Sequence, residues 1–377
     1  MQEALKGIRV LDLTMNLPGP FMTWLMAEMG AEILKVESPK GGDFARSFTD
    51  PEKADYFPIF DAVNRGKKSI TLDLKLDTDR KRFLELVKNC NIIVEGFRPG
   101  VMKKLGIDYD TVKQQYPEVI YVSLTGYGQT GDYSSKGGHD LNYQALAGSF
   151  DTGRGITSPS VPTVPIADLG GGSLFALSGL LAAILRRDRT GKGCHLDVSL
   201  YDGAFALNVF AFCQMQRNRI RKETSSHFLA GVQPFYHIYE TSDGGYMSLG
   251  AVEPKFWSTF CNTAGCEELI PEQFGGRNVI RRVAEIFKTR TRAEWIERFR
   301  NVDACCEPVL TMQEAVDSDI CWQRNLVRET GSGRLTLTSP LKSVNPSPRK
   351  VTKAPLLGEH NTLLNLENFA TGKKNGI

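Results

Sequence analysis

The sequence predicts an α/β protein with a doubly wound, mostly parallel sheet in a large domain, followed by a smaller α+β domain. Strand-like and helix-like segments alternate through the N-terminal third. Four or more strands separated by helices are typical of an open sheet with helices on both faces. The pattern changes after residue 222, and a chain of 377 residues is long enough for about two domains.

The first β-α-β unit of this sheet lies at the N-terminus. Residues 8–13 form a β-rich run, and the Pro-Gly-Pro segment 18–20 interrupts it. Residues 21–29 then have helical spacing, and residues 32–36 form a second strand. Two strands joined by one helix over about 30 residues imply a parallel pair with a right-handed crossover.

The same alternation continues along the chain. Apolar residues recur at helical spacing in 79–88, which predicts an amphipathic helix. An apolar helix is expected from the glycines at 170–172 to Leu185, and a long helix is expected at 201–215. Further strands are expected at 69–74, 91–97, 118–124 and 194–200.

The segment 225–325 has the pattern of a smaller α+β domain. The basic run 217–222 before it is interpreted as a solvated linker. An antiparallel hairpin is predicted at 237–249, with its turn at 242–245. Short helices are expected near 254–263, 280–288 and 292–298.

Composition excludes several classes of protein. The 46 basic and 43 acidic residues give a net charge of +3, whereas a nucleic-acid-binding protein carries a basic excess. The longest apolar run, 173–185, has 13 residues, and a membrane span needs about 20. The N-terminus has no basic region followed by an apolar core, so no secretory signal is predicted. We therefore expect a cytoplasmic protein with no nucleic-acid or membrane partner.

The cysteines and histidines show no metal-binding pattern. The eight cysteines form no CxxC pair, and the five histidines form no HxxxH pair. In a long chain without a secretory signal the cysteines are expected to be reduced thiols. No metal site is predicted from these spacings.

A literal GxGxxG motif at Gly126, Gly128 and Gly131 follows the strand at 118–124. A dinucleotide site also requires a helix to begin inside the motif. Residues 132–138 have loop composition instead, and the motif lies after several strands. It is interpreted as a flexible loop at the carboxyl edge of the sheet, which is where open α/β sheets bind ligands.

Three residues stand at positions where acid/base chemistry is possible. His139 lies between a glycine-rich loop and a helix start, so it either acts on a ligand or belongs to a helix cap, with Asp140 or Asn142 as the capping side chain. Asp168 precedes three glycines and an apolar helix. It is either a carboxylate base or a cap, and amides at that helix start could bind an anion. Glu253 precedes a helix that starts with proline, where a helix-terminal charge is the favoured interpretation.

Basic residues also mark a possible anion site. Arg98 follows a strand end, where a guanidinium suits a phosphate. Together with the NRGKK segment 64–68 it could form a cationic rim for a phosphorylated carrier. An ordinary charged surface is an equally good interpretation.

Taken together, these segments resemble the family III CoA-transferase superfamily and, within it, the α-methylacyl-CoA racemases. The resemblance covers nearly the whole chain. It rests on motifs such as GIRVLDL, VEGFRPG, GHDLNY, ADLGGGS and GAVEP, within the segments 7–13, 18–21, 29–39, 64–75, 94–107, 121–131, 138–148, 167–173, 189–203, 239–256, 305–311 and 354–360.

The resemblance implies a reaction and its residues. In the racemases the histidine of GHDxNY and the aspartate before GGGS are the two acid/base groups, which fall on His139 and Asp168. The glutamate that supports the histidine falls on Glu253. The implied activity is inversion of the α-carbon of a 2-methylacyl-CoA thioester by two-base proton transfer through an enolate. Backbone amides after Asp168 or at His139 and Asp140 are the expected donors to the enolate oxygen.

The alternative is a CoA-transferase of the same superfamily. Transferases usually lack a histidine at the GHD position, and their single aspartate, matching Asp168, forms an acyl anhydride. His139 and Glu253 together favour the racemase. The acyl group is not implied, because residues 15–18 are unusual for the family.

The resemblance also implies where CoA binds, as part of the substrate, with no metal or redox cofactor. Ser38 stands where racemases often have an arginine that holds CoA, and Lys35 and Lys40 are the candidates to replace it. The implied CoA contacts are Leu72, Asp73, Leu74, Lys75, Gly96, Phe97, Arg98, Lys104, Gly138, Asp140, Leu141, Asn142 and Tyr143.

The implied domain organisation is discontinuous. The large domain comprises 1–200 and a returning segment, 326–377, while 201–224 is a linker helix region and 225–325 is the small domain. Two chains are expected to interlock as a homodimer, in which Glu253 comes from the partner chain.

Overall fold

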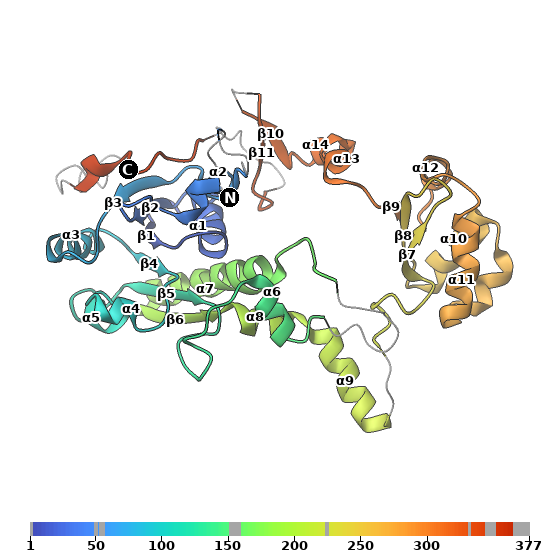
Figure 1. The fold of residues 1–377 in the computed structure, drawn as a ribbon, viewed down its shortest axis with the longest axis horizontal. Coiled ribbons are helices and arrows are strands. Elements are labelled where there is room, and N and C mark those ends of the chain that lie inside the picture. The colour runs from blue at the N-terminus through green and yellow to red at the C-terminus, as the bar shows by residue number, and fades with distance from the viewer. Residues whose placement is uncertain are drawn as a thin grey trace. The chain divides into compact units, whose positions relative to one another are not determined.

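The structure is a computed structural model that describes residues 3–48, 52, 57–150, 160–222, 226–330, 333–343 and 352–364. Within these ranges the chain forms two compact units (Figure 1). The larger unit contains the described parts of 1–150, 160–208 and 325–377, and the smaller unit contains those of 209–324. The division after residue 208 runs through the segment 201–224, which the sequence assigns to a linker.

The larger unit is built on one six-stranded sheet whose neighbouring strands are all parallel. Leu11 pairs with Leu34 on one side and with Ile93 on the other. The chain moves outwards in both directions from the two central strands, so their carboxyl ends form the topological switch point. The predicted doubly wound fold is confirmed. In spatial order the strands are β3 (Lys68–Thr71), β2 (Glu32–Glu37), β1 (Arg9–Leu13), β4 (Ile92–Glu95), β5 (Ile120–Thr125) and β6 (Cys194–Ser199).

Helices cover both faces of this sheet, because successive side chains of a strand point to opposite faces. Val10 belongs to a core formed with α1 (Pro18–Glu28) and α7 (Phe175–Thr190). Its neighbour Leu11 belongs to a second core, formed with α3 (Asp77–Val87) and α5 (Tyr109–Gln115). All residues of β1, β4 and β5 are buried, which explains why these strands are continuous apolar runs in the sequence.

Shorter elements complete the larger unit. The segment 353–361 runs beside β3, where Gly66 N–H donates to Lys353 O at 3.1 Å and His360 N–H donates to Ser69 O at 2.9 Å. The other elements are η1 (Phe44–Phe48), α2 (Ile59–Asn64), α4 (Val101–Lys104), α6 (Asp140–Leu146), the π-helical η2 (Ala167–Leu174), α8 (Leu200–Leu207), the antiparallel pair β10 (Val327–Glu329) and β11 (Leu335–Leu337), and η4 (Asn361–Leu364).

The smaller unit packs helices against an antiparallel sheet. β7 (Tyr236–Glu240) pairs with β8 (Tyr246–Gly250), which confirms the predicted hairpin, and β9 (Cys306–Pro308) adds to β8. Its core is rich in aromatic rings, with Tyr239, Phe260 and Phe287 stacked in series. Its helical elements are α9 (Val209–Arg221), α10 (Pro254–Ala264), η3 (Glu267–Glu272), α11 (Gly276–Phe287), α12 (Arg292–Phe299), α13 (Met312–Asp317) and α14 (Asp319–Gln323).

Two helix predictions are wrong in detail. α1 begins at Pro18 rather than at 21, because proline fits the first turn, where its missing N–H would have no intrahelical partner. The helix predicted at 201–215 is two helices, since α8 reaches its C-cap at Asn208 and α9 begins at Val209. The basic run lies at the end of α9, where positive charge is favourable, and its role as a linker stays a prediction.

One continuous helix, Ala167–Thr190, is long and apolar enough by length and composition to cross a membrane, and no other helix in the described ranges meets this test. The apolar run counted in the sequence, 173–185, is shorter than this helix, because Asp168 and the glycines 170–172 precede the run and the charged residues 186–189 follow it. A core helix of a soluble protein passes the same test. Ala176, Leu180 and Ile184 of this helix are buried in the core against the sheet.

Candidate active site

The loops that leave the carboxyl ends of β1, β4 and β5 enclose a cavity of about 390 Å³, hereafter the first cavity. This is the switch point of the sheet, and the volume lies within the range of small-molecule sites, about 300–1,000 Å³. The lining comes from residues 13–16, 18–19, 96–99, 124–126, 134, 136–139, 143, 168 and 200.

His139 lines the first cavity from the N-cap of α6. Its N–H donates to Asn142 Oδ1 at 3.0 Å, and Asn142 N–H donates back to His139 O at 2.8 Å. The backbone of His139 therefore takes part in the helix cap, as the capping interpretation predicts, while the residue also lines the cavity. The two interpretations of the sequence are compatible at this position.

Asp168 lines the same cavity from the first turn of η2. A π-helical turn of this kind is frequent at functional sites. Burial and, secondly, the negative charge of Asp140 raise the pKa of Asp168 from 3.8 to about 7. A carboxyl group with such a pKa can both release and accept a proton near neutral pH, as a general acid or base must.

Asp140 connects the two candidate acid/base groups. It follows His139 in the chain, and its Oδ1 accepts a hydrogen bond from Asp168 N–H at 3.0 Å. Its other oxygen accepts from Gln144 Nε2 at 2.5 Å. Asp140 therefore fixes the start of η2 against α6, and it also supplies the charge that opposes ionisation of Asp168. From the sequence, Asp140 was expected as a helix cap, a backbone donor or a CoA contact, and its link to Asp168 was not predicted.

The glycines after Asp168 bring two helices together. A Cβ on Gly171 would lie 2.7 Å from Ala204 N, and a Cβ on Gly203 would lie 2.0 Å from Gly171 O. η2 and α8 thus meet backbone to backbone. At Gly171 the neighbouring helix therefore occupies the space that a ligand would need.

The amides at the start of η2 are also engaged. Asp168 N–H donates to Asp140 Oδ1, and Leu169 N–H donates to Pro165 O at 3.0 Å. The expectation that amides next to Asp168 bind an anion is therefore wrong for these two. Of the other donors that the sequence offered, His139 N–H is engaged as well, whereas the first amide of α6, at Asp140, has no acceptor within its helix.

The GxGxxG segment is a loop, as predicted, because no helix begins within residues 126–139. Its first glycine makes room for Tyr143: a Cβ on Gly126 would lie 2.6 Å from Tyr143 Oη. Tyr143 O–H donates to Gly138 O at 2.6 Å and so holds the segment that precedes His139. The motif serves the architecture of the site rather than a dinucleotide.

A second cavity, of about 300 Å³, lies at the carboxyl ends of β2 and β3. Its lining includes all four residues of the segment 72–75. Leu13, Thr14, Met15 and Phe97 line both cavities, so the two spaces adjoin at the switch point. A ligand with two separate ends has room to occupy both.

Nine of the thirteen predicted CoA-binding residues line one cavity or both, namely Leu72, Asp73, Leu74, Lys75, Gly96, Phe97, Arg98, Gly138 and Tyr143. The other four line neither. Lys104 is exposed on α4, and Asp140, Leu141 and Asn142 form the first turn of α6. The contacts of all thirteen with CoA stay predictions.

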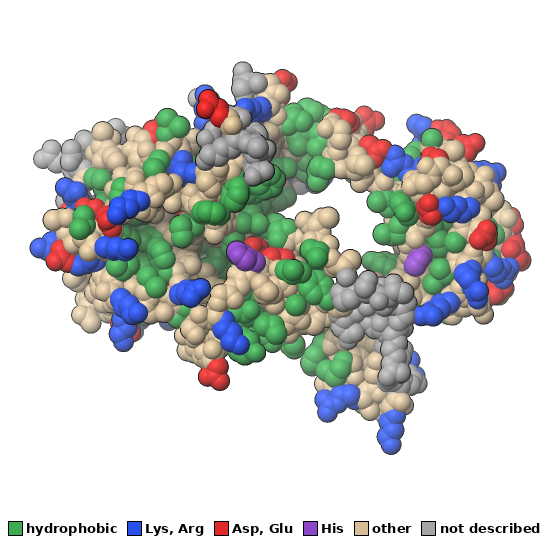
Figure 2. All heavy atoms as spheres, viewed as in Figure 1, with side chains coloured by type: hydrophobic (Ala, Val, Ile, Leu, Met, Phe, Trp, Pro, Cys, Tyr) green, Lys and Arg blue, Asp and Glu red, His purple; other side chains and the backbone are tan. Residues whose placement is uncertain are grey.

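The cationic rim expected from 64–68 is not formed. Lys67 is buried and donates to Asp12 Oδ2 at 3.2 Å, and Lys68 pairs with Glu32. Arg65 donates to the carbonyls of Ala62 and Leu337. On the face drawn in Figure 2, basic and acidic side chains are interspersed. The exposed cations that line the cavities are instead Arg98, Lys136 and Lys75.

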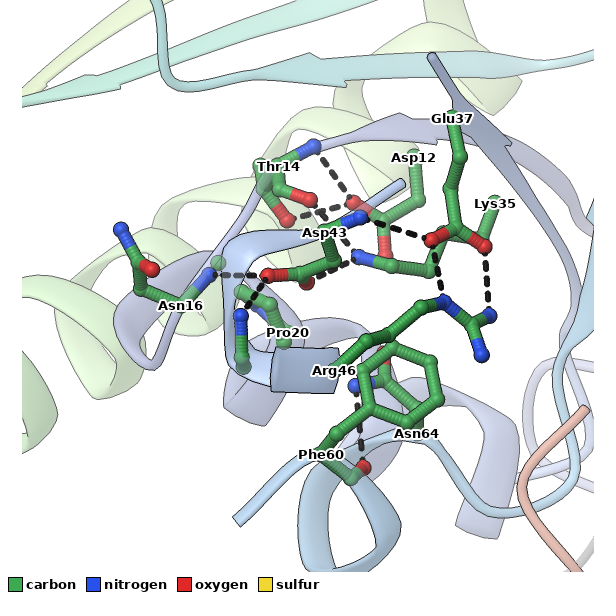
Figure 3. Close-up of polar contacts among 12 residues, drawn as sticks. Asp12, Thr14, Asn16, Pro20, Lys35, Glu37, Asp43, Arg46, Phe60 and Asn64 are labelled. Carbon is green, nitrogen blue, oxygen red and sulfur yellow. Dashed lines mark hydrogen bonds and ion pairs between the residues drawn. The ribbon is translucent and has the colours of Figure 1, made fainter. Parts of the chain in front are cut away.

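Lys35 is not a substitute for the arginine that Ser38 replaces. Its side chain is fully buried, and it pairs with Asp43 at 2.9 Å (Figure 3). Ser38 itself lines the second cavity, whereas Lys40 is exposed and lines neither.

Buried charges next to this pair are strongly coupled. Burial alone would raise the pKa of Asp12, but Lys67, Lys35 and the hydroxyls of Thr14 and Thr23 outweigh it and hold that pKa well below its usual range. Burial lowers the pKa of Lys67 to about 8 in spite of Asp12. Asp12, Lys67 and Lys35 therefore place buried charged side chains beneath the loop that follows β1.

Glu253 belongs to the smaller unit, where it is the N-cap of α10 and precedes Pro254. Phe256 N–H and Trp257 N–H donate to its carbonyl oxygen at 3.0 and 3.1 Å. Glu253 therefore lies at a helix terminus, as the helix-terminal interpretation predicts. The role of Glu253 towards His139 stays a prediction. Among the described residues no group of His, Cys, Asp and Glu has the arrangement of a metal site, and none of the eight cysteines, all of which are described, forms a disulfide.

Sequence reasoning missed several lining residues, among them Asn16, Ser134 and Lys136. The lining by segment 14–16 could have been predicted, because this segment directly follows a strand that is central in the sheet. Ser134 and Lys136 lie inside a long loop, and no pattern in the sequence marks them.

Comparison with known proteins places these features in a family. The model of CoA-transferase family III matches residues 5–361. The chain belongs to this family. It is 32% identical to the α-methylacyl-CoA racemase of Mus musculus, covering 94% of this chain and 91% of the relative. It is also 32% identical to the succinyl-CoA:mesaconate CoA-transferase of Haloarcula hispanica, covering 98% of each.

Solved structures of the family share the fold. A crystal structure of a CAIB/BAIF family protein from Brucella suis matches with a TM-score of 0.82 and 25% identity, covering 98% of this chain and all of that one. A protein from M. tuberculosis matches with the same TM-score and 28% identity, covering 96% and 99%. Among the curated relatives, a racemase and a transferase are equally similar to this chain, each at 32% identity.

Proposed function

We propose that this family III protein is an α-methylacyl-CoA racemase, which inverts the α-carbon of a 2-methylacyl-CoA thioester. The observation that carries the proposal is that His139 and Asp168 line one cavity and that the pKa of Asp168 is raised to about 7. The racemases of mouse and human, at 32% and 31% identity, support it.

The chemistry needs two proton carriers and a stabilised enolate. In one direction the Asp168 carboxylate takes the proton from the α-carbon, and the C–H electron pair moves into the enolate with negative charge on the thioester oxygen. The protonated imidazole of His139 then returns a proton to the opposite face, and the carbonyl re-forms. The reverse direction exchanges the two roles. Each positioned acid or base typically contributes about 10²–10⁴-fold in rate.

The enolate oxygen needs a hydrogen-bond donor in place before the proton moves. We assign this donor to the Asp140 N–H, since the amides of Asp168 and Leu169 already have acceptors. Asp140 then has two roles in the reaction. Its N–H binds the enolate oxygen, and its negative charge keeps the pKa of Asp168 high.

The substrate is assigned to both cavities. The thioester and its α-carbon occupy the first cavity, beside His139 and Asp168, while the nucleotide end of CoA occupies the second, beside Leu72 and Lys75. Arg98 and Lys136 supply positive charge at the first cavity. Glu253 of a partner chain orients the imidazole in a homodimer.

A CoA-transferase is the second candidate, and the equal identity of a transferase relative favours it. In that reaction the Asp168 carboxylate attacks the thioester carbonyl carbon, a C–O bond forms and the C–S bond breaks, so that CoA leaves as a thiolate and an acyl anhydride of Asp168 remains. That mechanism gives His139 no task, and a pKa near 7 keeps much of Asp168 in its non-nucleophilic protonated form at neutral pH.

One experiment separates the two functions. The protein is incubated in D₂O with one enantiomer of a 2-methylacyl-CoA, with and without an added free carboxylic acid. Deuterium at the α-carbon with inversion, independent of the acid, supports the racemase. Transfer of CoA to the acid, with hydroxylamine trapping an acyl-enzyme and no α-exchange, would refute it. His139→Ala should abolish racemisation but would leave a transferase intact.

A further inference from the structure

The loop that follows β1 forms the wall where the two cavities meet. Thr14 and Met15 line both cavities, and Asn16 lines the first. The Met15 side chain is 44% exposed, so it contributes surface to these spaces rather than to the core. Any ligand that occupies both cavities must pass this segment.

Two buried charges hold this loop on either side of Met15 (Figure 3). Lys35 Nζ donates to Thr14 O at 2.7 Å, on the N-terminal side of Met15. Asp43 Oδ1 accepts from Asn16 N–H at 3.0 Å, on the C-terminal side. Lys35 Nζ and Asp43 Oδ2 form an ion pair at 2.9 Å, with both side chains fully buried. The ion pair thus joins the two points that fix the backbone of Met15.

Further hydrogen bonds fix Asp43 in this position. Asp43 Oδ1 also accepts from Ala45 N–H at 2.9 Å, and Asp43 N–H donates to Glu37 Oε2 at 2.9 Å. Asn16 has a φ of +64°, a left-handed conformation that asparagine tolerates better than most residues. The hydrogen bond that Asn16 N–H donates to Asp43 holds the loop in this conformation.

Stability alone does not account for such a pair. Replacing a buried ion pair by apolar residues of similar volume is often neutral or stabilising. A fully buried lysine and aspartate at the switch point therefore need another reason, and their contacts supply one: both act on the backbone that carries Met15.

We propose that Lys35 and Asp43 are a positioning pair that sets Met15 at the junction of the two cavities and thereby controls the binding of ligands that span it. The proposal rests on the function proposed above in taking that ligand to be an acyl-CoA thioester. Neither residue touches the reacting atoms, and Asp43 also lines the second cavity, so the pair acts on the KM of the full substrate rather than on kcat.

The test replaces both charges at once. In the double variant Lys35→Met/Asp43→Leu no buried charge is left without a partner. We expect the KM for acyl-CoA to rise by at least about tenfold with kcat changed by less than about threefold. The KM of the corresponding S-acyl-N-acetylcysteamine, which lacks the nucleotide and fills the first cavity alone, should change by less than about twofold. Hydrogen exchange of the peptide covering 13–17 should accelerate.

The matched control removes an ion pair that does not touch the loop. Arg9 and Glu32 stand at the starts of β1 and β2, away from the switch point, and pair at 2.9 Å. The double variant Arg9→Met/Glu32→Leu should leave both KM values and the exchange of 13–17 unchanged. An equal rise in KM for the long and the short thioester in Lys35→Met/Asp43→Leu, or no rise for either, would overturn the proposal.

A second variant covers the case in which the double variant does not fold. Met15→Trp enlarges an exposed side chain at the junction. It should weaken equilibrium binding of acetyl-CoA by at least about tenfold while changing the affinity for adenosine 3′,5′-bisphosphate by less than about twofold. If Met15→Trp weakens the binding of both ligands, or of neither, the proposal is overturned. A wild-type protein that binds acetyl-CoA but exchanges no α-proton would refute the racemase and leave these binding results valid.

Discussion

Replacing Asp168 by asparagine should stabilise the larger unit at alkaline pH while it removes activity. Burial and the charge of Asp140 raise the pKa of Asp168 from 3.8 to about 7 in the folded chain. Between these values the folded state keeps a proton that the unfolded state has released. The free energy of unfolding therefore falls as the pH rises towards and through 7. Asparagine keeps the shape, carries no charge and escapes this loss.

The size of the effect follows from the two pKa values. One pH unit of pKa change corresponds to 1.36 kcal/mol, so raising the pKa from 3.8 to about 7 costs roughly 4 kcal/mol once the group is ionised. Part of this cost is already present at pH 5. The wild type should lose a further 2–3 kcal/mol, roughly, between pH 5 and pH 9 relative to Asp168→Asn.

Urea unfolding of both proteins at pH 5, 7 and 9, followed by circular dichroism, measures this difference. Other titrating groups are common to both chains and cancel in the difference. The control is Asp188→Asn on α7, an aspartate that is 58% exposed, for which the difference should stay flat. If the advantage of Asp168→Asn grows by less than about 0.5 kcal/mol from pH 5 to pH 9, Asp168 is not the destabilised carboxyl described above.

Three other variants test separate parts of the structure. Glu95→Gln should also weaken the loss of stability that accompanies a rise in pH towards and through 7 in urea unfolding, because burial raises the pKa of Glu95 from 4.5 to about 7; curves parallel to the wild type would contradict this. Gly203→Ala should cost roughly 2–3 kcal/mol in thermal unfolding, since its Cβ would lie 2.0 Å from Gly171 O, and an unchanged Tm would refute the contact. Lys67→Met should cost about 3–5 kcal/mol by leaving Asp12 buried without its ion-pair partner, and adding Asp12→Asn should restore most of it in the same assay.

The sequence predicted the sheet because its central strands are buried on both faces and therefore appear as continuous apolar runs, as in β1 and β4. The contact between η2 and α8 could not be predicted in this way. It depends on Gly171 meeting Gly203, two glycines from different segments whose approach only the tertiary structure reveals. The split of the predicted helix 201–215 is of the same kind, because the two compact units divide there.

The candidate site was predictable as residue types but not as an arrangement. His139 and Asp168 were found from motifs, and the topology of the sheet then brings both to one cavity. The buried charges were misjudged, because Lys35 and Lys67 look like surface cations in a sequence. Their partners, Asp43 and Asp12, lie in other segments, and burial depends on the complete fold.

The central claim, that His139 and Asp168 act on opposite faces of one α-carbon, is tested most directly by exchange of each enantiomer separately. His139→Ala and Asp168→Asn are incubated in D₂O with the R and then with the S form of a 2-methylacyl-CoA, and deuterium and configuration are followed. We predict that neither variant inverts the centre, and that each retains exchange of one enantiomer only, the two variants retaining opposite ones. Loss of exchange for the same enantiomer in both variants, or inversion that persists in either, would contradict the two-base account.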